Sequence, residues 1–224
     1  MCFSASMDLT AGMLVTGLGV DALSHVTKRE QRPLAALPLL FGIHQLVETV
    51  VWWHVDGQAS AQASSVAVFV YLLIALGIAP LLVPYAFLRL KLTRPFVGWL
   101  CLAAGVVAMG FDVWGMGKGP MTAHQDGHHL AYDLTVPYSQ MGLPLYVIAT
   151  CLPAIIGRSH LIRLFGVMNL IVVSILAALA QSGVISLWCV WAAVTSFLIC
   201  VYLRRQARGI AEVPASVGTG TSTL

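Results

Sequence analysis

Hydrophobic residues gather into seven long runs along the chain, separated by short polar segments. A helix needs roughly 20 apolar residues to cross the hydrocarbon layer of a bilayer. The runs are too long for strands, and they lack the alternation of a membrane β-barrel. We therefore expect seven membrane-spanning helices, over residues 5–26, 34–55, 66–88, 95–115, 138–156, 161–182 and 185–203.

The basic residues predict the orientation of these spans. If the chain crosses seven times, eleven of the twelve Lys and Arg residues fall on one side of the membrane and only Lys118 falls on the other. Segments rich in Lys and Arg stay in the cytoplasm, so we expect the N-terminus outside and the C-terminus in the cytoplasm. The other eleven lie in or beside the segments after the first, third, fifth and seventh spans: Lys28, Arg29, Arg32, Arg89, Lys91, Arg94, Arg158, Arg163, Arg204, Arg205 and Arg208.

Composition supports an all-α integral membrane protein. Hydrophobic residues make up 58% of the chain and charged residues 9%, whereas a soluble domain is about a quarter charged. We expect residues 1–203 to form one transmembrane domain in the plasma membrane. Residues 204–224, rich in Gly, Ser and Thr, are expected to be a disordered cytoplasmic tail. The bilayer is the expected partner, and no nucleic acid is expected.

Glu48 is the most informative polar residue, because a carboxyl within a membrane span is costly and normally faces the bundle interior. His44 lies four residues earlier and shares its helix face. A neutral Glu48 that fixes helix packing is one interpretation. The others are a metal ligand, a general acid or base, or a proton carrier.

Other titratable residues crowd the same outer half. Asp112 lies near the outer end of the fourth span, and a His-rich loop from Met116 to Pro137 follows it. We expect Glu48 and Asp112 as catalytic residues. His44, Glu48 and His129 are the expected ligands of a transition metal such as zinc, copper or iron. A solvated polar loop is an equally good interpretation. If the segment near His129 is helical, Tyr132 lies on the same face.

Two of the five cysteines, Cys2 and Cys189, fall near the outer face. A disulfide between them would persist outside the cytoplasm. A pair of thiolates that binds a soft metal is the competing interpretation. The remaining three lie at inner or central depths and are expected to pack as apolar residues.

Several short motifs run along the chain up to about Leu203. They comprise the opening Met1-Cys2-Phe3-Ser4-Ala5 and the segments 38–48, 129–132 and 186–189. In these motifs the chain resembles an uncharacterised family of small bacterial polytopic membrane proteins. The resemblance implies a bacterial inner-membrane location and supports the architecture, but it implies no reaction.

Three functional hypotheses remain open. The first is a membrane enzyme or metal-binding protein whose site opens to the outer leaflet and takes an apolar or lipid-like molecule. The second is a small-molecule or proton-coupled transporter, and the third is a non-catalytic accessory subunit or receptor. No phosphate-binding glycine loop, dinucleotide fingerprint or G-x-S-x-G elbow occurs in the sequence.

Overall fold

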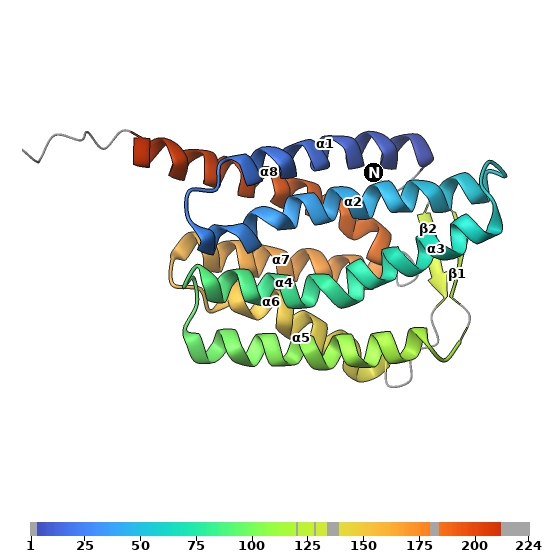
Figure 1. Ribbon diagram of the computed structural model, residues 1–224. Helices are drawn as coiled ribbons and strands as arrows, with labels where there is room; N and C mark the ends of the chain where they lie inside the picture. The colour runs from blue at the N-terminus through green and yellow to red at the C-terminus, as the bar shows by residue number, and fades with distance from the viewer. Residues whose placement is uncertain (1–3, 120, 128, 134–138, 180–183, 212–224) are drawn as a thin grey trace, which may run out of the picture.

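The computed structural model describes residues 4–119, 121–127, 129–133, 139–179 and 184–211 as a bundle of long helices with one β-hairpin (Figure 1). A π-helix, Leu73–Ile78, joins α3 to α4, and a short 3₁₀-helix, Arg29–Gln31, precedes α2. The other elements are α1 Ala5–Ser24, α2 Arg32–Val55, α3 Ala61–Leu72, α4 Ala79–Arg89, α5 Pro95–Met116, β1 Thr122–Asp126, β2 His129–Asp133, α6 Ser139–Ile155, α7 His160–Leu179 and α8 Val184–Ala211.

Local chemistry explains where several helices begin. The Ser4 hydroxyl accepts a hydrogen bond from the Met7 amide at the start of α1, and Ser60 accepts one from Ala63 at the start of α3. Such caps satisfy amides that have no partner within the helix. Pro95 begins α5, a position at which proline's missing N–H costs nothing.

The helices follow the predicted hydrophobic runs closely, with α3, the π-helix and α4 together filling the third run. Among the described residues, three helical stretches are long and apolar enough to cross a membrane: Arg29–Val55, Ala61–Arg89 and Pro95–Met116. Large apolar side chains also lie on the outer surface, with Phe96 79% exposed and Trp99 61% exposed. Such a surface indicates a lipid environment.

The C-terminal helix differs from the expectation. α8 continues to Ala211, so the first part of the predicted disordered tail is helical. The residues just after the predicted boundary include Arg204, Arg205 and Gln206, which are good helix formers. Residues 212–224 of that predicted tail lie outside the described residues.

Small residues let α1 and α2 pack closely along their length. A Cβ atom at Gly19 would collide with the backbone of Leu39, and one at Gly42 would collide with Thr16. Close approach through small residues is the usual way in which membrane helices associate. This packing makes α1 and α2 an antiparallel pair.

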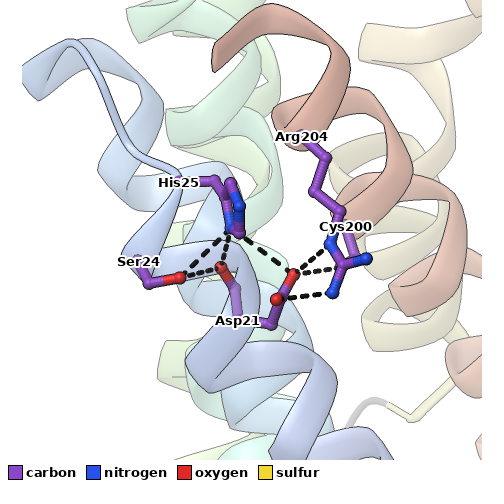
Figure 2. A network of polar contacts seen from close by, with 5 residues as sticks. All are labelled: Asp21, Ser24, His25, Cys200 and Arg204. Atoms are coloured by element: carbon purple, nitrogen blue, oxygen red, sulfur yellow. Dashed lines mark hydrogen bonds and ion pairs between the residues drawn. The ribbon is translucent and has the colours of Figure 1, made fainter. Parts of the chain in front are cut away.

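A polar network joins α1 to α8 at the end of the bundle that carries the basic residues (Figure 2). Arg204 binds both carboxylate oxygens of Asp21, at 2.6 and 2.8 Å. The thiol of Cys200 donates to Asp21 Oδ2 at 2.8 Å. His25 Nδ1 lies 2.8 Å from the Asp21 backbone oxygen, to which Ser24 also donates. The network therefore fixes the last turn of α1 against α8.

Candidate functional site

The side chain of Glu48 is completely buried at the other end of α2, away from the basic residues. Its neighbours on the helix, His44, Gln45 and Thr49, are also buried. Four polar side chains in two turns of an apolar helix would be costly without partners. The hydroxyl of Tyr132 supplies one, because it donates to Glu48 Oε1 at 3.3 Å.

Three aromatic rings stack beside this carboxyl group. The ring of His44 lies on Tyr71 with centroids 3.9 Å apart, and Tyr71 lies on Tyr132 with centroids 4.5 Å apart. The ring planes of the two pairs are inclined to each other by only 17° and 14°, respectively. The stack therefore joins α2, α3 and β2. Its two outer rings belong to His44, one turn from Glu48, and to Tyr132, which donates to Glu48.

A hairpin brings Tyr132 to this position. β1 and β2 pair in antiparallel fashion, with Asp126 opposite His129. Gly127 takes the left-handed conformation, with φ +60°, that a tight hairpin turn requires. Figure 1 shows the hairpin at the end of the bundle where α2 ends and α3 begins.

The strand geometry overturns the helical placement of His129 and Tyr132. Successive side chains of a strand point to opposite faces, so residues three apart cannot share one. Leu130 and Tyr132 face the bundle, and Leu130 is completely buried. His129 Nε2 instead lies 3.7 Å from Asp126 Oδ2, and His124 Nδ1 lies 3.0 Å from Asp133 Oδ2. These four side chains, on the face opposite to Tyr132, thus pair within the hairpin.

An apolar cluster surrounds the ring stack. Its buried members come from α2, α3, α5 and β2: Val51, Trp52, Ala67, Val68, Tyr71, Leu72, Met116 and Leu130. The indole nitrogen of Trp52 is buried and has no hydrogen-bond partner in the described part of the chain. Glu48, one turn before Trp52, therefore lies in a largely apolar, aromatic setting.

Asp112 lies one turn before Met116 on the same face of α5, and it is buried. A Cβ atom at Gly142 of α6 would lie 3.5 Å from Asp112 Oδ1. Asp112 thus faces α6, whereas Glu48 meets β2. The structure brings both predicted catalytic residues to one end of the bundle without a described hydrogen bond between them.

Asp8 of α1 is a second completely buried carboxyl group at this end. Gly12 packs against Leu46, and Gly42 packs against Thr16. Continuing this antiparallel register by one turn brings Asp8 level with the turn of α2 that holds Glu48. Asp8 was not among the predicted site residues, because its burial depends on the packing of α1 on α2.

The predicted metal set is divided in the structure. His44 and Glu48 lie one turn apart on α2, whereas His129 lies on the face of β2 opposite to Tyr132. Within the described residues, no group of three or more His, Cys, Asp or Glu side chains is arranged to hold a metal ion. The structure therefore gives the metal prediction no support.

The predicted Cys2–Cys189 pair lies outside what the structure describes, because Cys2 and the side chain of Cys189 are not among the described parts. The three cysteines that are described, Cys101, Cys151 and Cys200, are buried and free. All three are buried as expected, but Cys200 donates to Asp21 and Cys151 accepts from Asn169, so these two do not pack as purely apolar residues.

The geometry combines groups that can exchange protons in a dry setting. A carboxyl group can give or take a proton, a phenol can donate a hydrogen bond, and imidazole can do both. Tyr71 and Trp52 were not among the residues predicted for the site, because aromatic residues in apolar runs look like ordinary core. Only the stack on His44 distinguishes Tyr71.

Comparison with known proteins agrees with the family seen in the sequence motifs. Neither the curated proteins nor the solved structures contain a match to the chain. One family model does match, over residues 1–214, and its description is "Family of unknown function (DUF6629)". The chain therefore belongs to this family of unknown function.

Proposed function

We propose that this protein is a seven-span membrane enzyme, with its N-terminus outside and its C-terminus in the cytoplasm, whose acid–base residue is Glu48. The substrate would be an apolar or lipid-like molecule that reaches the outer half of the bundle. The observation that carries this proposal is the complete burial of Glu48 beneath the Tyr132 hydroxyl, one turn from His44.

The proposed roles follow from the position of each group. Glu48 would transfer a proton to or from the substrate, and the Tyr132 hydroxyl would hold the carboxyl group in one orientation. His44, held in place by its stack on Tyr71, would act as the second proton-exchanging group. Asp8, level with Glu48, offers a further carboxyl group, and interacting carboxyl groups commonly divide acid and base roles.

Labelling with a membrane-impermeant maleimide tests the orientation. Gln125→Cys in the hairpin and Ser159→Cys between α6 and α7 replace exposed side chains at opposite ends of the bundle, in a parent in which Cys2 and Cys189 are replaced by Ser. In intact cells the first variant should be labelled and the second should react only after the membrane is opened. Labelling of Ser159→Cys in intact cells would overturn the proposed orientation.

Analysis of membrane lipids tests the activity. Cells that express the wild type should lose one lipid-like compound and gain its product, relative to cells that express Glu48→Gln at equal protein level. Asp56→Asn is the matched control, because Asp56 lies just after α2 and its side chain is exposed. If Glu48→Gln and the wild type yield the same lipids and differ only in stability, Glu48 has a packing role.

Two measurements separate the alternatives. Purified protein that binds zinc, copper or iron, and loses it in His44→Ala, would favour the metal-dependent form of the enzyme. Proton uptake into proteoliposomes that Glu48→Gln abolishes would favour the transporter hypothesis. We expect neither result, because the described residues assemble no metal set and the α2 face below His44 is apolar at Leu34, Leu37 and Phe41.

A further inference from the structure

A cavity of about 440 Å³ lies in the other half of the bundle, toward the basic end. Residues of α2, α4, α6, α7 and α8 line it. Its volume falls within the range of about 300–1,000 Å³ that is typical of small-molecule sites. The cavity is separate from the Glu48 site, which uses α2, α3 and β2.

The cavity is elongated along the helices. Its lining on α8 extends from Trp191 to Tyr202, which is about 16 Å at the helical rise per residue. An elongated cavity of this length suits an extended hydrocarbon chain.

The wall is apolar along most of this length. Phe41, Val83 and Ile199 are representative of the lining. Two polar groups at the deep end are already bound to protein: Trp191 Nε1 donates to Asn169 Oδ1 at 2.6 Å, and Asn169 Nδ2 donates to Cys151 Sγ at 3.2 Å. Because these two donors have protein partners, the deep end favours an apolar ligand.

The shallow end of the cavity reaches a basic rim. Leu92 lines the cavity there, and its carbonyl oxygen accepts a hydrogen bond from the Arg158 amide at 2.8 Å. Lys91 precedes Leu92, and Arg163 follows the lining residue Ile162. The side chains of Lys91, Arg158 and Arg163 are all exposed. These three exposed side chains, the basic rim, therefore lie near the end of the cavity at which a headgroup would remain.

Among the described residues, no ion pair joins the basic rim to the two acidic residues at this end. Asp21 is bound by Arg204, and Glu30 is exposed in the 3₁₀-helix before α2. Basic side chains near a membrane surface attract anionic headgroups. An elongated apolar cavity with basic residues at one end suits a molecule with an apolar chain and an anionic end.

We propose that the cavity between α2, α4, α6, α7 and α8 binds one single-chain anionic amphiphile, with its chain beside Phe41 and Val83 and its headgroup at the basic rim. A fatty carboxylate and a monoacyl phospholipid share this chemistry. The proposal is independent of the acid–base role of Glu48.

Photo-crosslinking of the wild-type protein in a neutral detergent tests where the chain lies. The probe is palmitate that carries a diazirine on its chain, and peptide mass spectrometry locates the adducts. We expect adducts on the cavity lining of α2, α4 and α8, and competition by unlabelled palmitate. Adducts on the exposed faces that do not compete would overturn the proposal.

Equilibrium binding of tritiated palmitate to filled-cavity variants gives a second test. Val83→Trp places an indole inside the cavity and should weaken binding at least tenfold. Val106→Trp is the matched control, because Val106 is 51% exposed on α5, and it should bind like the wild type. Equal binding by the two variants would overturn the proposal.

The choice of headgroup distinguishes the two sources of this ligand. Palmitate and palmitoyl lysophosphatidate are compared with neutral monopalmitoylglycerol. We expect the neutral compound to bind at least tenfold more weakly than the better anion, and the better anion to identify the headgroup. Replacing Lys91, Arg158 and Arg163 together by Gln should remove this preference. Equal affinity for the three ligands would overturn the anionic part.

Glu48→Gln separates this proposal from the proposed function. The variant should bind palmitate like the wild type even where it loses activity. If Glu48→Gln abolishes palmitate binding, the cavity is not an independent site and the further proposal fails.

Discussion

Asp21 and Glu48 are acidic residues at opposite ends of the same helix pair, and their surroundings differ in almost every respect. Asp21 is part-exposed, with 24% of its side chain accessible, and Arg204 binds both of its oxygens. Glu48 is inaccessible, and its described donor is the neutral Tyr132 hydroxyl. The guanidinium of Arg204 thus binds the carboxyl group near solvent, and the phenol of Tyr132 binds the buried carboxyl group.

The difference indicates which carboxyl group has a structural role. Asp21 joins the end of α1 to α8, and an ion pair that water can reach is a common and weakly stabilising surface feature. Glu48 lies among aromatic rings, where a carboxyl group costs more to bury and contributes less to packing than an apolar residue would. Such a residue is expected where a function requires it.

Tyr71→Ala should have the largest effect on this comparison. Tyr71 is completely buried between the rings of His44 and Tyr132, and removing a buried aromatic side chain costs about 3–5 kcal/mol. Thermal unfolding in detergent should show a large loss of stability. Tyr85→Ala, at a 40% exposed position on α4, should cost far less. Equal losses would show that the stack is not part of the core.

Tyr132→Phe should have an intermediate effect. The variant keeps the ring and removes the hydroxyl that donates to Glu48, and loss of a donor to a buried group costs about 1–3 kcal/mol. Because the Glu48 carboxyl group is buried, the loss should depend little on salt. Infrared spectra should also show a shifted carboxyl band that Glu48→Gln removes. An unshifted band would contradict the hydrogen bond.

Arg204→Gln should have the smallest effect, because the pair with Asp21 is open to solvent. Stability should fall slightly at low salt and recover relative to the wild type at high salt, where exposed charges are screened. Arg205→Gln is the control, since no ion pair is described for exposed Arg205. If the loss of stability persists at high salt, the Asp21–Arg204 pair is not screened by solvent, and the proposed contrast with the buried Glu48 carboxyl group is wrong.

The helices could be predicted from the sequence because membrane spans are recognised by their length and hydropathy. Glu48 and His44 were selected for the same reason, since polar residues stand out in an apolar run. Both are buried, and their functional roles stay predictions. The orientation and the full number of spans stay predictions.

The hairpin was missed, although Asp126-Gly127 is a strong turn signal. The surrounding segment is polar and mixed, with few β-branched residues, and was interpreted as a loop or a helix. The roles of Tyr71 and Asp8 could not be predicted either. Each depends on contacts between elements distant in sequence, which no local pattern encodes.

The π-helix between α3 and α4 has a consequence for insertions and deletions. Tyr71 of the ring stack and Ala79 of the cavity are eight residues apart, which would rotate them by about 80° from each other in a regular α-helix. The wider i→i+5 turn holds one extra residue and returns Ala79 to the face of Tyr71. Removing one residue within Leu73–Ile78 should therefore preserve both faces, whereas the same deletion in α5 would rotate every later side chain of that helix. Length variation among members of this family is expected to concentrate in this turn.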